Sequence, residues 1–503
     1  MRSKTPSFIL ELPLKTTPAH ESTILIRLDT GRQLYNACLG ECLKRLDLLR
    51  QSKEYQSTIK LPKGKERTEA FKNLNKKYEF TEYDIHHYAA TVRNSWINEH
   101  IGIHIAQTLA TRAFRAVQNK AFKKAKHVRF KGKNQFDTLE GKNNQTGLIF
   151  RENTLHWSGI EIPCIIDENN NVMAYGLNPE HRIKYCRIVR RKINSINRFY
   201  LQLILEGTPY HNPKHKIGYE EIGLDVGPST IAIVGDNKAE LKQFCSDIVP
   251  KQKEKRKLQR KLDRQRRSNN PQNYNENGTI KKGKKKWNKS NQYNKTSSEI
   301  AELDRKLAAH RKSLHGKDIN DIIAMGTRIN TEKISYKSWQ KNFGKSVLMR
   351  APSMFMGRLK QKAENAGGYL NEFGTQNTKL SQICHTCGVA VKKPFSQRWH
   401  TCCDINIQRD LYSAFLSKCV DMNTNTLDLA RAGMLWPGLE PVLSEAILRV
   451  NQSTSSGNCP DSFGLRNQRQ SGSPVKPAAS ITEAMDVVIR DTIYEDESHG
   501  EVI

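Results

Sequence analysis

The feature that most constrains the fold of this 503-residue chain is one carboxylate inside an otherwise apolar pattern. Residues 221–234 read EIGLDVGPSTIAIV, which predicts a strand, a tight Gly-Pro turn and a second, β-branched strand. Asp225 lies at the centre of the first predicted strand, where burial of a carboxylate is unfavourable unless a cation or hydrogen bonds compensate it. From this pattern alone, Asp225 is either a metal ligand or a turn residue that bonds backbone amides.

The charge balance indicates the kind of partner. The chain has 82 Lys and Arg against 51 Asp and Glu, a formal net charge of +31, and nucleic acid is the commonest partner of so basic a protein. A chain of this length should contain three or four structural units. Apolar runs of 18 residues are absent from the sequence, which excludes an ordinary transmembrane helix, and the first residues do not form a signal-peptide apolar block. The eleven cysteines do not read as a disulfide framework, so we expect a reducing, cytoplasmic location.

The first two hundred residues combine strand and helix patterns. Short alternating segments between about residues 146 and 206 predict a small β-barrel, which the strand pattern at 7–14 would join. Between the N-terminal strand and these later segments, apolar residues recur at helical spacing over about 22–53, 83–99 and 101–126. The helices are therefore expected to be inserted between two parts of the barrel.

Positive charge is concentrated in two places. The first interleaves cations with phenylalanines, a pattern that favours nucleic-acid contact over a plain solvated face. Its residues are Lys120, Phe122, Lys123, Lys124, Lys126, Arg129, Phe130, Lys131, Lys133 and Phe136. The second is a predicted basic helix at Lys251–Arg267, a polar loop at 268–297 and a second helix at Ser298–Ile322, which together resemble an antiparallel arm. From about Asn451 the composition predicts disorder.

Four cysteines have the spacing of a zinc ribbon. Cys384-His385-Thr386-Cys387-Gly388 is a two-thiolate knuckle, and His400-Thr401-Cys402-Cys403 follows at ribbon spacing. The second group is irregular, because a standard ribbon would have C-x-x-C there. Two ligand sets remain open: either Cys402 and Cys403 both bind with the first pair, or His400 and Cys403 bind and Cys402 does not.

Two further carboxylates are candidates to join Asp225. Glu332 lies in a predicted short strand, and Asp410 opens a predicted helix just after the second knuckle. Taken singly, Glu332 reads equally well as an exposed strand end and Asp410 as a helix-capping residue. Two-metal phosphodiester hydrolysis needs several carboxylates from separate elements, and the three together around a zinc ribbon fit that requirement.

These segments resemble the TnpB proteins of bacterial insertion sequences, transposon-encoded relatives of type V CRISPR effectors. The Asp225 strand resembles the first RuvC motif of that family, and Glu332 with SYKSWQKNFGK at 335–345 resembles the second. The knuckles followed by QRDLYSA at 408–414 resemble the zinc ribbon and the third motif, and RAPSMF at 350–355 and SFGL at 462–465 also look familial. Three features depart from the family pattern: the H-x-C-C knuckle, Asp404 in place of a glycine, and Tyr412 in place of an asparagine.

The resemblance implies a multidomain α+β fold with a ribonuclease-H-like RuvC core of mixed sheet and flanking helices, an inserted zinc ribbon, a β-barrel wedge module and a helical recognition insert. The implied boundaries are 1–20 and 127–216 for the wedge barrel, 21–126 for the recognition domain, 217–379 for the RuvC domain with its basic arm, 380–405 for the zinc ribbon, 406–450 for the remainder of RuvC and 451–503 for a mostly disordered tail.

The implied activity is RNA-guided cleavage of DNA beside a short adjacent motif, at a single RuvC site. The resemblance assigns two Mg²⁺, or Mn²⁺, to Asp225, Glu332 and Asp410. It assigns one structural Zn²⁺ to four ligands: Cys384, Cys387, Cys402 and Cys403, with His400 as the alternative to Cys402. The implied partners are a guide RNA and double-stranded target DNA, without a membrane.

The sequence leaves three rival functions to be compared with this one. A nuclease-inactive relative would bind DNA under RNA guidance and act as a repressor, but such proteins lose catalytic carboxylates and this chain has all three. A compact type V CRISPR effector would differ in the origin of its guide. A transposase performing strand transfer would use a similar site, but the family likeness argues against it.

Overall fold

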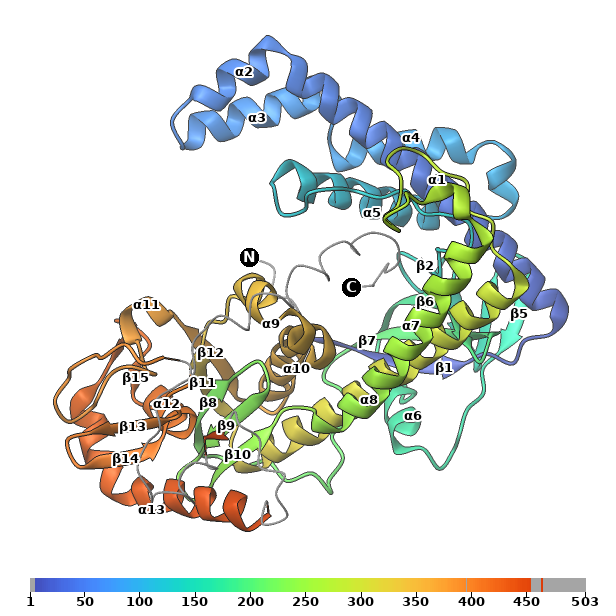
Figure 1. The fold of residues 1–503 in the computed structure, drawn as a ribbon. Helices are drawn as coiled ribbons and strands as arrows, with labels where there is room; N and C mark the ends of the chain where they lie inside the picture. Colours follow the sequence, from blue (N-terminus) through green and yellow to red (C-terminus); the bar gives the residue numbers. More distant parts are fainter. Residues whose placement is uncertain (1–4, 395, 454–462, 465–503) are drawn as a thin grey trace. The chain divides into compact units, whose positions relative to one another are not determined.

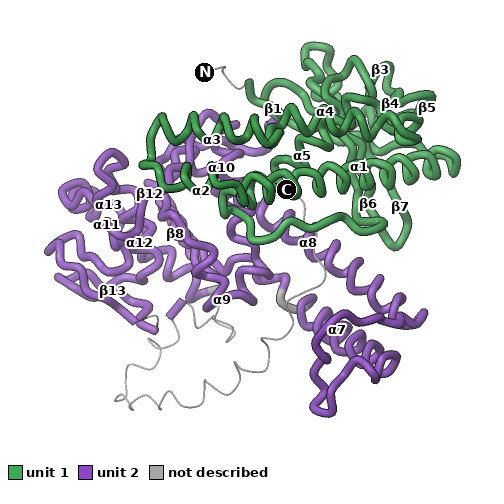
Figure 2. The backbone as a smooth tube through the Cα atoms, turned by 90° about the horizontal axis from the view of Figure 1, so that it is seen from above, with its two compact units in different colours: residues 1–210, 494–503 green, residues 211–493 purple. Residues whose placement is uncertain are grey.

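The computed structural model describes residues 5–394, 396–453 and 463–464 of the chain. They fall into two compact units that divide between Tyr210 and His211 (Figure 2). Both units combine helices with β-sheets. None of the helices in these ranges is long and apolar enough to cross a membrane.

The first unit places five helices between the first strand and the remaining strands in chain order (Figure 1). The elements are β1 (Ser7–Pro13), α1 (Pro18–Gln51), α2 (Lys53–Lys60), α3 (Lys65–Lys77), α4 (Glu82–Arg93), the 3₁₀ turn η1 (Trp96–Glu99), α5 (Ile103–Ala121), β2 (Thr138–Glu140), β3 (Ile149–Arg151), β4 (Thr154–Trp157), β5 (Ile160–Pro163), α6 (Asn171–Gly176), β6 (Ile183–Ile193) and β7 (Ile196–Glu206). The N-terminus of the long helix α1 is capped by Thr17, whose hydroxyl accepts a hydrogen bond from the backbone N–H of His20. Pro18 occupies the first turn.

The strands of this unit form two antiparallel sheets, one in the order β1-β7-β6-β2 and one in the order β3-β4-β5. An isolated bridge between Leu14 and Cys164 joins the end of β1 to the end of β5. The expected pairing of the N-terminal strand with the later strands is confirmed, because β1 pairs with β7 along its whole length. The lysine-rich loop that the composition predicts near Lys60–Arg67 is a short connection, because α2 ends at Lys60 and α3 begins at Lys65.

The second unit is built on a five-stranded mixed sheet in the order β10-β9-β8-β11-β12. The strands are β8 (Glu221–Val226), β9 (Thr230–Val234), β10 (Ala239–Gln243), β11 (Arg328–Glu332) and β12 (Tyr369–Phe373). β8 pairs antiparallel with β9 and parallel with β11, which is itself parallel to β12. The predicted strand–turn–strand around Asp225 is therefore confirmed, and β8 is the central strand of the sheet.

Helices cover both faces of this sheet (Figure 1). One face packs on α12 (Arg409–Ser417) and α13 (Leu429–Ser453) in a core that includes Leu241, Leu411 and Leu443. The other packs on α8 (Asn291–Met325) and α10 (Pro352–Asn365) in a core that includes Leu224, Ile322 and Phe355. The remaining elements are η2 (Ser246–Ile248), α7 (Val249–Asn269), η3 (Pro271–Asn273), α9 (Tyr336–Arg350), α11 (Thr375–Thr378), β13 (Trp399–Cys402), β14 (Ile405–Gln408), β15 (Val420–Asp421) and β16 (Thr426–Leu427).

Helices α7 and α8 form the expected antiparallel pair, but the connection between them is more ordered than predicted. The fully buried Asn270 donates hydrogen bonds to the carbonyls of Arg266 and Asn288 and accepts one from the Asn288 N–H. α8 also begins at Asn291, before the expected Ser298. The predicted disordered tail lies outside the described residues, apart from the end of α13 and from Phe463 and Gly464.

Candidate metal centre

Two of the three candidate carboxylates lie at the same edge of the central sheet. Asp225 is the next-to-last residue of β8, not its centre as expected, and Glu332 is the last residue of β11. The two strands run parallel, with Thr331 paired to Leu224, so their carboxyl ends meet one residue further along. Both side chains are half-buried.

Asp410 reaches this edge because α12 packs unusually closely on β8. A Cβ added at Gly223 would lie 1.8 Å from the carbonyl oxygen of Ala414, so only glycine lets the helix backbone approach the strand at this distance. The helix begins directly after β14, and the Gln408 side chain caps it by accepting a hydrogen bond from the Leu411 N–H at 2.8 Å. Asp410 therefore lies in the first turn, as predicted.

The electrostatics of the three carboxylates link them to one another. Burial raises the pKa of Asp225 well above its usual value, and the neighbouring carboxylates of Asp410 and Glu332 raise it further. Burial also raises the pKa of Glu332 and that of Asp410. Three carboxylates in this environment favour a bound cation, because their ionised forms repel one another.

Two arginines that the sequence patterns did not point to lie beside this site. The buried Arg409 has its Nε 3.8 Å from an Asp410 carboxylate oxygen and donates a hydrogen bond to the Pro394 carbonyl at 3.1 Å. Arg409 and Arg398 both oppose the rise in the pKa of Asp410. Arg409 could have been found from the sequence, since it directly precedes Asp410, whereas Arg398 is near only through the fold.

The ligand atoms of Asp225, Glu332 and Asp410 do not form one cluster that could surround a single metal ion. In the part of the chain that the structure describes, the four cysteines are the one convergent group of three or more candidate metal ligands. One ion would therefore not be enclosed by Asp225, Glu332 and Asp410 as they stand.

The structure brings together all four predicted cysteines. The ligand atoms of Cys384, Cys387, Cys402 and Cys403 lie within 4.8 Å of one another, a set that could hold a metal ion. The Cys402 sulfur lies 3.7 Å from that of Cys387 and 3.6 Å from that of Cys403, so these thiols are close without being bonded. Cys384 is buried, whereas Cys387 and Cys403 are exposed.

The turn between β13 and β14 allows two adjacent cysteines to enter this group. Cys402 pairs with Ile405, which leaves Cys403 and Asp404 as a two-residue hairpin turn. Both have left-handed backbone conformations, with φ of +48° and +63°. A turn with two positive φ angles favours Asn-Gly or Asp-Gly, which accounts for a glycine at position 404 in the family pattern.

His400 is not part of the cysteine group. Its side chain is buried, its ring centroid lies 4.3 Å from that of Tyr412, and its Nδ1 faces the Lys393 amine. Burial and the nearby Lys393 lower the pKa of His400 to about 4, so this ring is neutral at neutral pH.

Tyr412 connects the first knuckle to the helix that carries Asp410. This side chain is fully buried, and its hydroxyl accepts a hydrogen bond from the His385 N–H at 3.0 Å and lies 2.7 Å from His385 Nδ1. The ring also packs against Trp436 of α13 at 5.7 Å. Since His385 directly follows Cys384, the position of the knuckle is coupled to that of α12.

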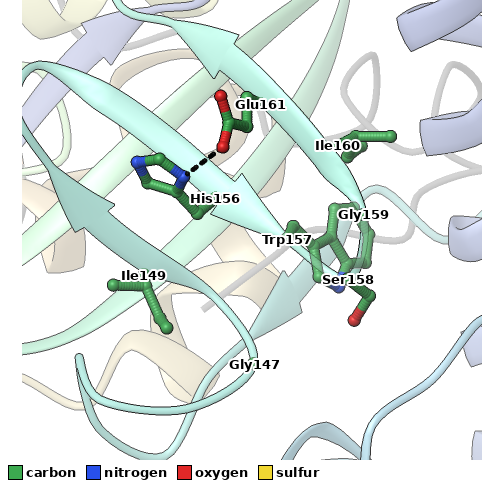
Figure 3. Close-up of a pocket in the computed structure, with 8 residues that line it drawn as sticks. All are labelled: Gly147, Ile149, His156, Trp157, Ser158, Gly159, Ile160 and Glu161. Carbon is green, nitrogen blue, oxygen red and sulfur yellow. Dashed lines mark hydrogen bonds and ion pairs between the residues drawn. The ribbon is translucent and has the colours of Figure 1, made fainter.

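Two surface pockets lie away from these groups. The first, in the first unit, has a volume of about 350 Å³ and is lined by Gly147, Ile149, His156, Trp157, Ser158, Gly159, Ile160 and Glu161. Figure 3 shows the contact between two of these side chains, in which His156 Nδ1 lies 3.1 Å from a Glu161 oxygen. The second, of about 290 Å³, lies around the Glu221–Arg431 ion pair at the opposite end of β8 from Asp225. Neither pocket includes a predicted site residue.

Comparison with known proteins adds only distant structural similarity. The chain matches no protein-family model, and it matches no curated protein. Among solved structures, it is similar to a cryo-EM structure of a Cas12f1–sgRNA–target DNA complex, with 11% identity over 82% of this chain and 98% of that one and a TM-score of 0.41. It is also similar to a cryo-EM structure of a CRISPR–Cas12f ternary complex, with 14% identity over 79% of this chain and 81% of that one and a TM-score of 0.27.

Proposed function

We propose that this protein is an RNA-guided DNA endonuclease of the TnpB type that cuts DNA by two-metal-ion phosphodiester hydrolysis at one RuvC site. The observation that carries the proposal is the meeting of Asp225, Glu332 and Asp410, from distant parts of the sequence, at the carboxyl edge of the central strand. The effect of Asp410 and Glu332 on the pKa of Asp225 supports the same grouping.

The architecture around the carboxylates supports a ribonuclease-H-like core. Such nucleases place a metal-binding aspartate on their first strand, and β8 is both the first strand of its sheet in the chain and its central strand. In this proposal the second unit is the RuvC domain with its zinc ribbon and basic arm. The first unit supplies the wedge sheets and the helical recognition domain.

The proposed metals have distinct roles. A bound pair of Mg²⁺ would activate a water molecule and stabilise the leaving 3′ oxygen. Asp225, Glu332 and Asp410 would hold that pair, while Arg409 and Arg398 offset part of their negative charge. The four cysteine sulfurs suit a single Zn²⁺, which prefers tetrahedral thiolate ligands and would fix β13, β14 and α12 in place.

Guide RNA and double-stranded target DNA are the proposed partners. The net charge of +31 supports a polyanion, and the resemblance to TnpB supplies the guide. One face of α7 offers a surface for a phosphate backbone, since its exposed cations recur at helical spacing. These cations are Lys253, Arg256, Lys257, Arg260 and Arg264.

The guide is the first part of the proposal to test. The protein should be purified and its RNA sequenced, and the segment expected to pair with DNA should be replaced by one of chosen sequence. We expect RNA to copurify, its affinity to fall steeply with salt, and the reprogrammed complex to cut a matching site in a library of flanking sequences.

Three outcomes separate the rivals. Binding that follows the guide without cleavage would favour a nuclease-inactive repressor. A copurified RNA with CRISPR-repeat sequence would favour a type V effector over a TnpB protein. A preparation that neither contains RNA nor binds it in a salt-dependent way would contradict the proposal.

A further inference from the structure

The last two residues of α5 and the segment after them form a basic and aromatic strip, residues 120–133, which is held along helix α1. At one end, Arg50 of α1 donates a hydrogen bond to the Ala121 carbonyl at 3.4 Å. At the other end, the Asn36 side chain accepts from the Lys131 N–H at 2.8 Å and donates to the Lys131 carbonyl at 2.9 Å. From Arg50 to Asn36 the helix rises by about 20 Å. The strip is therefore anchored at both ends, and residues 122–133 have no helix or strand of their own.

The aromatic rings of the strip face solvent. Phe122 is 65% exposed and Phe130 is 55% exposed, whereas the nearby Phe136 is buried against Tyr35. Phe130 nevertheless has a defined place, since its ring lies just above the α1 surface at Gly40, where an added Cβ would be 3.8 Å away. Two exposed rings on a fixed backbone are costly to leave in water and are suited to stacking.

Three lysines of the strip are not paired with an acidic side chain in the part of the chain that the structure describes. Residues 120–133 include no Asp or Glu. Lys123, Lys124 and Lys126 are exposed and have no ion-pair partner among the residues that the structure describes. Two acidic residues of α1, Asp29 and Glu41, are already paired with Arg32 and Arg45. The strip therefore attracts a polyanion.

We propose that the strip binds a single-stranded nucleic acid, with bases stacked on Phe122 and Phe130 and phosphates held by the intervening lysines. A duplex would use only the lysines, because its bases are already stacked on one another, whereas a single strand offers free base faces beside its phosphates. This site lies in the first unit and does not depend on the proposed nuclease centre.

The test is direct binding by the full-length protein after its RNA is removed, without Mg²⁺, so that failure of the nuclease proposal does not affect the result. The probes are one sequence as single-stranded RNA, as single-stranded DNA and as duplex DNA. We expect the double change Phe122→Leu and Phe130→Leu to weaken the tighter-binding single strand about tenfold or more and to leave duplex binding unchanged. The preferred single-strand probe shows whether RNA or DNA is the ligand.

The chain offers a matched control. Tyr83 is 80% exposed in the same unit but lies between Glu82 and Asp84, so Tyr83→Leu should leave single-strand binding unchanged. The salt dependence is the slope of log K for single-strand binding against the logarithm of the salt concentration. Changing Lys123, Lys124 and Lys126 to Gln should make this slope shallower by about 0.7 for each phosphate that a lysine no longer neutralises. Equal weakening of single strand and duplex by the phenylalanine changes, or no more weakening than Tyr83→Leu causes, would overturn the proposal.

A second measurement needs no variant and so does not depend on folding. A single strand carrying 5-iodouracil should crosslink to the unaltered protein on irradiation, and the crosslinked peptides should include Phe122 or Phe130. Crosslinks confined to peptides outside 120–133 would also overturn the proposal.

Discussion

At residue 404 an aspartate occupies a left-handed backbone conformation that favours glycine. Asp404 has a φ of +63° in the hairpin turn that carries Cys402 and Cys403. Left-handed backbone costs an ordinary L-residue roughly 1–2 kcal/mol, although aspartate tolerates it better than most. We expect Asp404→Gly to stabilise the turn by about 1 kcal/mol and to slow the removal of zinc by a chelator. Thermal unfolding and chelator competition measure the two effects, and a less stable variant would mean that the Asp404 side chain has a role of its own.

A buried histidine in the second unit is expected to make the protein sensitive to acid. His315 is fully buried, its Nε2 lies 2.9 Å from the Arg350 carbonyl, and its ring stacks on Phe244. Burial lowers its pKa from 6.5 to about 4 in the folded state. The folded state therefore binds this proton less readily than the unfolded state, so its contribution to stability is present above pH 6.5 and is lost as the pH falls towards 4.

His315→Gln isolates this effect, because glutamine can still donate to the Arg350 carbonyl but does not titrate. Denaturant unfolding measures the free energy of unfolding at each pH. Between pH 7 and pH 4 this free energy should fall by on the order of 2 kcal/mol more in the unaltered protein than in the variant. Parallel pH profiles of the two proteins would rule out His315 as the source of the acid sensitivity.

At the scale of elements, the contact between β8 and α12 determines where Asp410 lies. An added methyl group at Gly223 would collide with the Ala414 carbonyl, so Gly223→Ala must push the helix away from the strand. We expect a loss of stability of about 1–3 kcal/mol and a larger loss of cleavage. Gly357→Ala in α10 is the matched control, because nothing lies within 4 Å of its added Cβ. If both variants behave alike, the close approach does not position Asp410.

The four-cysteine group and α12 should respond together. We expect one Zn²⁺ per chain, and we expect Ser in place of any of the four cysteines to remove it, including Cys402→Ser. His400→Ala should retain the metal, because its ring packs on Tyr412 outside the cysteine group. Metal content measures the ligand set, and hydrogen exchange over residues 380–416 measures the loosening of α12. Loss of zinc from His400→Ala with retention in Cys402→Ser would reverse the assignment.

The sequence predicted elements well where the pattern is local. The β8–β9 hairpin, β11 and the start of α12 all follow from short-range alternation and spacing, and the structure confirms them. The ordered connection after α7 was missed because a buried asparagine such as Asn270, satisfied by backbone carbonyls, does not look like a core residue in a sequence. The closeness of Arg398 to Asp410 depends on long-range packing and could not be predicted. Gly223 did carry a signal, since a glycine inside a strand often marks a close backbone approach.

At the scale of the whole molecule, the two units offer separate chemistry. The second unit contains the carboxylates and the four cysteines, and the first contains the basic and aromatic strip. Nucleic-acid binding and cleavage should therefore be separable by mutation. Carboxylates repel phosphate, so their removal should spare binding, which in the proposed function depends on cations and base pairing.

The most direct test of the proposed function is cleavage and gel shift measured in parallel on one guide-matched DNA target. We expect Asp225→Ala, Glu332→Ala and Asp410→Ala each to cut at least roughly a thousandfold more slowly while binding the target normally, because the metals act as a unit. Glu372→Ala, an exposed carboxylate on the neighbouring strand β12, should cut normally. Cleavage should need Mg²⁺ or Mn²⁺ and fail with Ca²⁺. Near-normal cutting by Asp225→Ala would contradict the assignment of the site.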